Sequence, residues 1–136
     1  MRILDESSNF LLWHEFEEVW LTDKRTDRKL YIGRHYGDPV QGIIGPDESW
    51  FLTAGEGLLF LDFSRKTHEF LRGGMDGAAI FVHSMRVQDE KNIRVLLDPW
   101  SDYPGTMVLH IDTLTLERIS EGPSLKGEPW REEVDF

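Results

Sequence analysis

Clusters of glycine and proline divide this chain into short segments, at about the 8–12-residue spacing that separates turns in antiparallel β proteins. These clusters occur at residues 37–39, 45–47, 73–74, 98–99, 103–105 and 122–123. Glycine and proline favour turns and interrupt helices, so the segments between them suit strands. We therefore expect a mostly β protein with little helix, in which about nine short strands form antiparallel sheets arranged as a sandwich or a propeller-like stack.

The expected strands are short segments rich in apolar, β-branched or aromatic residues: 13–22, 30–32, 40–44, 49–53, 58–63, 78–87, 93–97, 106–111 and 113–119. Residues 58–63 are apolar almost without interruption, which predicts a strand that is covered on both faces. In the last segment, Leu114 and Leu116 alternate with threonines, which predicts a strand with one apolar face. Residues 65–71 fit either a helical turn or a short strand.

Residues 13–22 allow two interpretations. Trp13, Phe16 and Trp20 lie near helical spacing, which is compatible with an amphipathic helix. Residues 30–32, however, are rich in β-forming side chains, and the polar run before them is typical of a hairpin loop. We favour the hairpin, in which residues 13–22 form a strand.

The chain has 136 residues, of which 40% are hydrophobic, and this length suits one domain. We expect a single β-rich domain over residues 1–136. Its tail, from about residue 122, is rich in Pro, Glu and Gly and is expected to be irregular. Gly73, Gly74 and Gly77 predict a stretch that is mobile or tightly turned.

The sequence contains no cysteine, which excludes disulfides, thiolate catalysis and cysteine-based zinc sites. The absence of disulfides also favours a reducing compartment. Residues 1–6 include two acids where a signal peptide carries basic and then apolar residues. No apolar run approaches the roughly 18–20 residues of a membrane span. We expect a cytoplasmic protein that does not contact a membrane.

The formal net charge is −10 at pH 7. Because affinity for phosphates comes mainly from Lys and Arg, no direct nucleic-acid partner is expected. An acidic surface instead attracts a basic partner and speeds its association. Acidic residues gather near both ends of the chain: Asp5, Glu6, Glu15, Glu17, Glu18, Glu128, Glu132, Glu133 and Asp135. If the termini approach each other, as chain ends often do, these acids form one face for a basic protein partner.

We find no catalytic motif in the sequence. A P-loop has glycines before Lys-Thr, whereas Lys66-Thr67 follows Phe-Ser-Arg, and the Gly-x-Ser-x-Gly of serine hydrolases is absent. The histidines show no metal-binding spacing, although separate strands can bring distant ones together: His14, His35, His68, His83 and His110. We therefore expect no catalytic residue, no metal and no cofactor, and the sequence argues against an enzyme.

Residues 37–44, Trp50 and residues 55–58 form a pattern that is similar to one in short uncharacterised bacterial proteins. As a whole, the chain resembles the small acidic immunity proteins of bacterial toxin systems, which are cysteine-poor, cytoplasmic and single-domain. This resemblance implies a protein-binding module whose acidic face occludes a basic toxin, with aromatic anchors supplying affinity. The expected partner contacts are Asp5, Glu15, Glu17, Glu18, Trp100 and Asp102.

Two other function classes also fit the sequence. A small-ligand or carbohydrate-binding β domain would use acids and loop aromatics around a cleft, namely Asp38, Trp50, Glu56 and Tyr103. Asp38 and Glu56 lie in glycine-rich turns that can present a side chain, although turn formation alone explains an Asp before Pro. A homo-oligomeric structural protein would instead pair through an exposed sheet edge.

Overall fold

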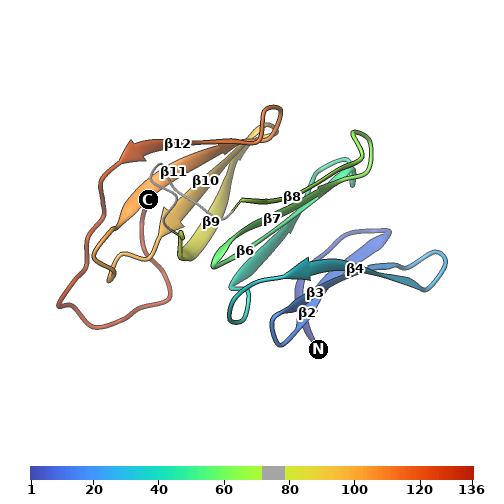
Figure 1. The fold of residues 1–136 in the computed structure, drawn as a ribbon, viewed down its shortest axis with the longest axis horizontal. Helices are drawn as coiled ribbons and strands as arrows, with labels where there is room; N and C mark the ends of the chain where they lie inside the picture. Colours follow the sequence, from blue (N-terminus) through green and yellow to red (C-terminus); the bar gives the residue numbers. More distant parts are fainter. Residues whose placement is uncertain (72–78) are drawn as a thin grey trace. The chain divides into compact units, whose positions relative to one another are not determined.

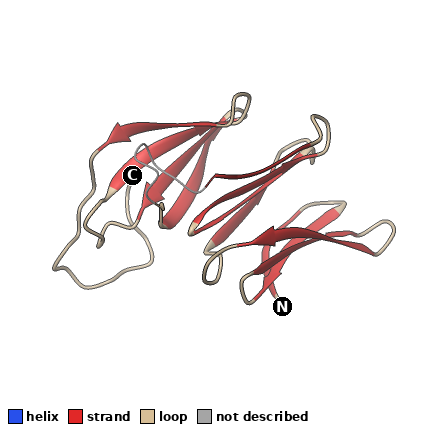
Figure 2. Ribbon diagram, in the orientation of Figure 1, coloured by secondary structure: helices blue, strands red, loops and turns tan. Residues whose placement is uncertain are grey.

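The structure, a computed structural model, describes residues 1–71 and 79–136. These residues form twelve strands and no helix (Figure 2). The strands make three four-stranded antiparallel sheets, so the expectation of a mostly β protein with antiparallel sheets is confirmed. The chain divides into two compact units, residues 1–80 and 81–136, which are described separately below. That the chain acts as one domain stays a prediction.

The first unit contains two sheets, each a meander of four consecutive strands (Figure 1). The first sheet comprises β1 (Arg2–Glu6), β2 (Phe10–Glu15), β3 (Glu18–Asp23) and β4 (Arg28–Arg34). The second sheet comprises β5 (Gln41–Ile44), β6 (Trp50–Gly55), β7 (Gly57–Asp62) and β8 (Thr67–Leu71). Because neighbouring strands are antiparallel, short turns are enough to connect them.

The two sheets of the first unit share one hydrophobic core. Successive side chains of a strand point to opposite faces, so Phe10 and Leu12 of β2 point into the core and Trp13 lies on the outer face. Apolar residues of both sheets complete this core: Val19, Leu21, Ile32, Ile44, Phe51 and Leu59. Phe10 and Phe51, one from each sheet, meet edge to face with ring centroids 5.1 Å apart. Gly42 lets β5 of the second sheet lie close to β1 of the first, since a Cβ there would lie 2.8 Å from the Cβ of Leu4.

Strands β6 and β7 are buried on both faces. Leu52 and Phe60 lie on one face and are 0% exposed, while Phe51 and Leu59 lie on the other and are 1% and 4% exposed. The prediction of a strand covered on both faces is therefore confirmed in β7. Phe63, the last residue of the predicted strand, lies beyond β7 and is 43% exposed.

The second unit is built on one sheet of four consecutive strands: β9 (Val82–Asp89), β10 (Asn92–Leu97), β11 (Gly105–His110) and β12 (Thr115–Ser120). Its buried apolar side chains come mainly from the two central strands: Ile93, Val95, Leu96, Leu97, Met107, Val108 and Leu109. The central strands therefore form the core of this unit, and the outer strand β12 is largely exposed.

The chain after β12 contains no further strand and is held to the second unit by hydrogen bonds. The Thr106 hydroxyl donates to the carbonyl of Gly122 at 2.8 Å, and the Leu125 amide donates to the carbonyl of Pro99 at 2.7 Å. The indole Nε1 of Trp100 donates to the carbonyl of Glu128 at 2.8 Å. Residues 122–128 are thus fixed at several points although they lack regular structure.

Most of residues 13–22 are in strands, as expected, but the prediction of one continuous strand is wrong. The alternative prediction of a helix is also wrong. The chain turns at Phe16 and Glu17, so this segment is divided between β2 and β3. The turn contains none of the Gly, Pro, Asn or Asp residues that mark turns in a sequence, which is why the pattern does not reveal it.

The structure has twelve strands rather than about nine, for three reasons. The segment 13–22 forms two strands, β1 is not predicted at all, and residues 65–71 adopt the strand alternative as β8. The prediction for Gly73, Gly74 and Gly77 falls outside the described residues, as does the beginning of the predicted strand 78–87.

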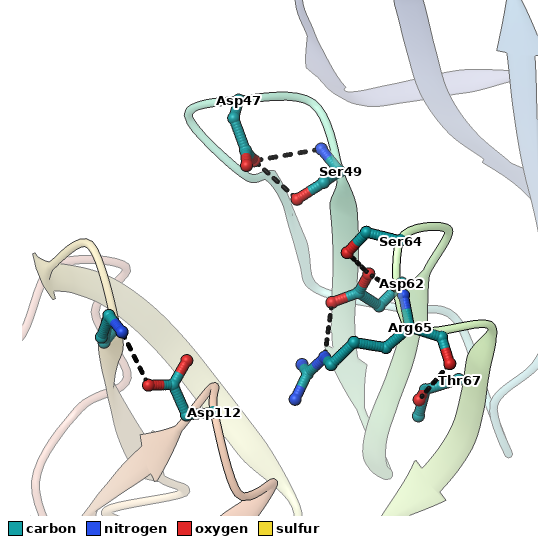
Figure 3. Close-up of polar contacts among 8 residues, drawn as sticks. Asp47, Ser49, Asp62, Ser64, Arg65, Thr67 and Asp112 are labelled. Carbon is teal, nitrogen blue, oxygen red and sulfur yellow. Dashed lines mark hydrogen bonds and ion pairs between the residues drawn. The ribbon is translucent and has the colours of Figure 1, made fainter.

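Asp62 closes the hairpin between β7 and β8 (Figure 3). Its Oδ1 accepts hydrogen bonds from the Ser64 hydroxyl at 2.7 Å and the Arg65 amide at 3.1 Å, and its Oδ2 accepts one from Arg65 Nε at 2.9 Å. Burial raises the pKa of Asp62, but the hydrogen bonds from Ser64 and Arg65 outweigh it and hold the pKa below its ordinary value. Asp47 organises the β5–β6 turn in a similar way by accepting two hydrogen bonds from Ser49 (Figure 3).

We expect Asp62→Asn to lower the free energy of unfolding by about 1–3 kcal/mol at pH 7, because the hydrogen bonds to a charged acceptor are weakened. Since the folded pKa of Asp62 lies below the unfolded one, this stabilisation is present above the unfolded pKa and is lost as the pH falls through the folded pKa. The difference between wild type and variant should therefore shrink as the pH falls below about 4, the ordinary pKa of an Asp carboxyl. Urea denaturation followed by tryptophan fluorescence measures it, and a difference independent of pH would contradict this role.

Leu12→Ala should lower the free energy of unfolding by about 2–5 kcal/mol, because Leu12 is 0% exposed and its removal leaves a cavity between the sheets. Leu30→Ala is the matched control in the same sheet. Leu30 is 45% exposed, so the expected loss is below about 1 kcal/mol. Urea denaturation compares the two variants, and equal losses would show that the shared core is not where the structure places it.

Candidate functional site

Three aromatic residues lie side by side across the outer face of the first sheet; we call Trp13, Trp20 and Tyr31 the aromatic row. Trp13 on β2 is the register partner of Trp20 on β3, which is in turn the partner of Tyr31 on β4. The two indoles are stacked with centroids 5.8 Å apart, and Trp20 meets Tyr31 edge to face at 5.1 Å. Trp13 Nε1 donates to the Thr22 hydroxyl at 2.9 Å. The row ends at Tyr31, which is 44% exposed and can be reached by a partner.

Two glutamates continue the outer face toward the end of the sheet. Glu15 is two residues from Trp13, and Glu18 is two residues from Trp20, so both share the face of the aromatic row. They are direct cross-strand partners, and both are exposed. Like charges in directly opposite positions destabilise a sheet. Arg34 on β4 is the register partner of Glu18, and its positive charge offsets part of this repulsion. The pair is therefore not explained by the stability of the fold.

Phe16 stands at the turn between these glutamates, and we call residues 15–18 the β2–β3 tip. Its side chain is 80% exposed, and its φ of 53° lies in the left-handed region. A bulky residue in that region costs roughly 1–2 kcal/mol, and Asn or Gly is more usual there. Phe16 thus contributes neither burial nor favourable backbone geometry, which points to a role outside folding.

Several neighbouring groups hold the β2–β3 tip in place. His14, which is 4% exposed, donates its Nδ1–H to the carbonyl of Phe16 at 2.8 Å. The backbone amide of His35 donates to the carbonyl of Glu17 at 3.0 Å. The guanidinium of Arg34 donates to the Glu17 carboxylate and lowers its pKa. The tip is therefore organised before any partner arrives, which reduces the entropy cost of binding.

His35 supports this region from inside the first unit and is 1% exposed. Its Nδ1 donates to the carbonyl of Glu56 at 3.0 Å, and its Nε2 accepts from the Thr53 hydroxyl at 2.8 Å. Burial lowers the pKa of His35, which favours the neutral ring, in which Nδ1 donates and Nε2 accepts. Because both ring nitrogens are engaged, His35 holds structure together and is not placed to act as a catalytic base.

A cavity of about 290 Å³ lies beside the β2–β3 tip. Its lining comes from four connected regions of the first unit and consists of Glu17, Arg34, His35, Tyr36, Glu56 and Phe70. Tyr36 is 76% exposed at the mouth, whereas Glu56 is 5% exposed at the turn between β6 and β7. Two carboxylates and two aromatic rings beside a cation suit a small polar ligand, or a polar side chain of a partner.

The structure brings three of the predicted partner contacts together on the β2–β3 tip: Glu15, Glu17 and Glu18. Asp5, on β1, accepts a hydrogen bond from the backbone amide of Ile44 on β5 at 2.8 Å. This side chain therefore links the two sheets of the first unit.

The other two predicted contacts belong to the second unit. The Trp100 ring lies 5.7 Å from the ring of His83 and 6.3 Å from that of Trp130, centroid to centroid, so it packs against both. Asp102 forms an ion pair with Lys126. Because the acids near the two chain ends belong to different units, a single acidic face stays a prediction.

Three of the residues predicted for a ligand cleft, Asp38, Trp50 and Glu56, belong to the first unit, and the fourth, Tyr103, belongs to the second. Glu56 lines the cavity beside the tip, and Asp38 is exposed in the loop after β4. Trp50 is a core residue: it is 5% exposed and stacks on Phe60 with centroids 6.0 Å apart. Tyr103 is 83% exposed and belongs to the second unit.

Phe16 and Tyr31 are the functional candidates that the sequence pattern does not single out. A detectable signal for Phe16 does exist, since one aromatic residue flanked by glutamates separates two short apolar segments. Tyr31 has no such signal, because its place in the aromatic row depends on the register between β3 and β4.

Among residues 1–71 and 79–136, no group of three or more His, Asp or Glu side chains is arranged to hold a metal ion. The described part of the chain also contains no helix with the length and apolar character that crossing a membrane takes. Comparison with protein-family models, curated proteins and solved structures finds no match to this chain.

We expect Phe16→Asn to raise the free energy of unfolding by about 0.5–1 kcal/mol, because Asn tolerates the left-handed conformation. Phe16→Ala is the control: it removes the exposed ring but keeps a Cβ in the same strained position, so its stability should stay within about 0.5 kcal/mol of wild type. Urea denaturation measures both variants. A loss of stability in Phe16→Asn would show that the ring contributes to folding.

Proposed function

We propose that this protein is a protein-binding module that recognises a basic partner through the β2–β3 tip and the adjacent aromatic row. The observation that carries this proposal is Phe16, an aromatic side chain that is 80% exposed and is held in a strained conformation between three glutamates. Evolutionary selection for stability alone disfavours such a residue, whereas exposed aromatic anchors are common at the centre of interfaces.

The arrangement of the tip supports a division of labour between apolar and charged groups. Phe16 and the accessible end of the aromatic row, Tyr31, supply apolar area that a partner can bury. Glu15 and Glu18 surround this area with negative charge, which steers a basic surface and disfavours acidic ones. Affinity then depends mainly on the aromatic residues, and the rate of association depends mainly on the glutamates.

The most specific form of the proposal is an immunity protein that occludes a basic toxin in the bacterial cytoplasm. It is supported by the net charge of −10, by the absence of cysteine and by the acidic tip. We also propose that the sheets are arranged as a sandwich or a propeller-like stack. In residues 1–80 this arrangement is supported by the core that two sheets share.

A small-ligand-binding function is the second candidate, and the cavity beside the tip favours it. That cavity places Glu17 and Glu56 near the rings of Tyr36 and Phe70, a combination that suits a polar organic ligand such as a sugar. A protein partner that inserts a polar side chain would use the same lining. The two candidate functions therefore differ in one respect. If the cavity is a small-ligand site, a small polar molecule binds to it in the absence of any protein partner.

The test of the proposed function is a pull-down from cells of the source organism, with the wild-type protein and variants as bait. We expect a basic protein to be retained by wild type and lost with Phe16→Ala, whose affinity should fall about 30-fold if Phe16 is an anchor. Glu15→Gln combined with Glu18→Gln should slow association and reduce its dependence on salt. Surface plasmon resonance with the purified partner measures both effects.

Glu90→Gln is the matched control, because Glu90 is an exposed glutamate in the turn between β9 and β10 of the second unit. It should bind the partner as wild type does. Retention of the same proteins by wild type and Phe16→Ala would refute the β2–β3 tip as the binding site. The immunity function further requires that the captured protein be toxic when expressed alone and inactive when this chain is present.

A further inference from the structure

A groove with a volume of about 500 Å³ opens at one end of the core of the first unit. Residues of both sheets line it: Phe10, Leu21, Asp23, Arg25, Arg28, Lys29, Leu30 and Phe63. Its volume lies within the range of roughly 300–1,000 Å³ typical of sites for small molecules. The groove is reached from the core side of the first sheet, so it is separate from the aromatic row on the outer face.

The floor and walls of the groove are apolar. Phe10 and Leu21 form the floor and are 8% and 2% exposed, whereas Leu30 and Phe63 are 45% and 43% exposed. Leu21 and Leu30 are cross-strand partners on β3 and β4, while Phe63 follows β7 in the second sheet. The two exposed side chains thus come from different sheets, and a ligand between them would bury apolar area on both.

Among the described residues, two of the three basic side chains in the lining, Arg28 and Lys29, form no ion pair. Arg25 donates to both oxygens of Asp23, with Nε to Oδ1 at 3.2 Å and its terminal nitrogen to Oδ2 at 3.1 Å, and its guanidinium lies 5.7 Å from the centre of the Phe10 ring. Arg28 is the cross-strand partner of Asp23 and is exposed. In the part of the chain that the structure describes, no ion pair involves Arg28.

Lys29 does not add to this charge. Residues 28 and 29 point to opposite faces of β4, and the Lys29 ammonium lies 5.8 Å from the centre of the Trp13 ring on the outer face. The charge available at the groove is therefore that of Arg28, since the charge of Arg25 is offset by Asp23. A guanidinium binds a carboxylate through two parallel hydrogen bonds, which makes Arg28 a specific anion contact.

We propose that this groove binds a small organic molecule with an apolar body and one anionic group, such as a medium-chain carboxylate. The apolar body lies on Phe10 and Leu21 between Leu30 and Phe63, and its carboxylate pairs with Arg28. The protein as a whole carries a charge of −10, which repels anions, so a preference for an anion has to come from local structure. This inference goes beyond the proposed function and is independent of the β2–β3 tip.

The test uses the full chain and isothermal titration calorimetry with decanoate and, separately, decylammonium, both below the concentrations at which they form micelles. We expect saturable 1:1 binding of decanoate and much weaker binding of decylammonium, although the net charge of the protein favours the cation. Arg28→Gln should weaken decanoate binding about tenfold through loss of a charge-assisted contact. Leu30→Ala should weaken it about fivefold through loss of apolar contact.

Arg2→Gln is the matched control, because Arg2 is an exposed arginine of the same unit that does not line the groove. Its affinity for decanoate should equal that of wild type. Absence of saturable binding, equal binding of the two amphiphiles, or equal effects of Arg28→Gln and Arg2→Gln would overturn the proposal. Circular dichroism verifies folding, and if Arg28→Gln does not fold, the comparison of decanoate with decylammonium in the wild-type protein decides.

Discussion

The contact between the two sheets of the first unit is the constraint on which its other features depend. Phe10, Leu12 and Leu21 can reach the core only if the first sheet presents one particular face to the second. A shift of one residue in the register would turn every side chain of a strand to the opposite face. The burial of Leu12 at 0% exposure therefore also places Trp13 on the outer face, beside Trp20 and Tyr31. One packing requirement thus determines both the core and the candidate binding surface.

The β2–β3 tip illustrates how this rigid support is used. His14 occupies a buried position and holds the carbonyl of Phe16, while the backbone of His35 holds that of Glu17. These hydrogen bonds keep a bulky residue in the left-handed conformation that it would avoid in an isolated turn. The stability of the core therefore offsets the unfavourable conformation of an exposed aromatic residue. This pattern is expected of a binding site rather than of a turn that only connects strands.

The distribution of charge also has more detail than the net value of −10 suggests. Glutamates gather at the tip on the outer face, whereas Arg25 and Arg28 lie at the groove that opens from the core side. Ion pairs then decide which charges remain available, because Asp23 engages Arg25 and Glu17 engages Arg34. An acidic protein can therefore contain both a surface for a basic partner and a site for an anion.

Much of the secondary structure is present in local sequence patterns. Short apolar segments between turn residues correctly predict strands such as β5, β10 and β11, and the apolar run in β7 correctly predicts burial on both faces. These features depend only on neighbouring residues, so no tertiary information is needed. The division between β2 and β3 is missed, because a Phe-Glu turn has no residue type that favours turns and is stabilised by distant groups at His14 and His35.

The candidate sites are decided almost entirely by tertiary structure. Glu15 faces Glu18, and Trp20 joins Trp13 to Tyr31, only through cross-strand register, while the groove combines Leu30 with Phe63 from a different sheet. Trp50 is expected to line a ligand cleft because of its residue type. In the structure it is a core residue, since Gly45 leaves room for its ring. The sequence by itself determined the strands, their apolar faces and the overall charge, since these follow from local pattern and composition. Only the packing of sheets decided which side chains meet, because contacts between distant residues arise when each strand buries its apolar face against a specific neighbour.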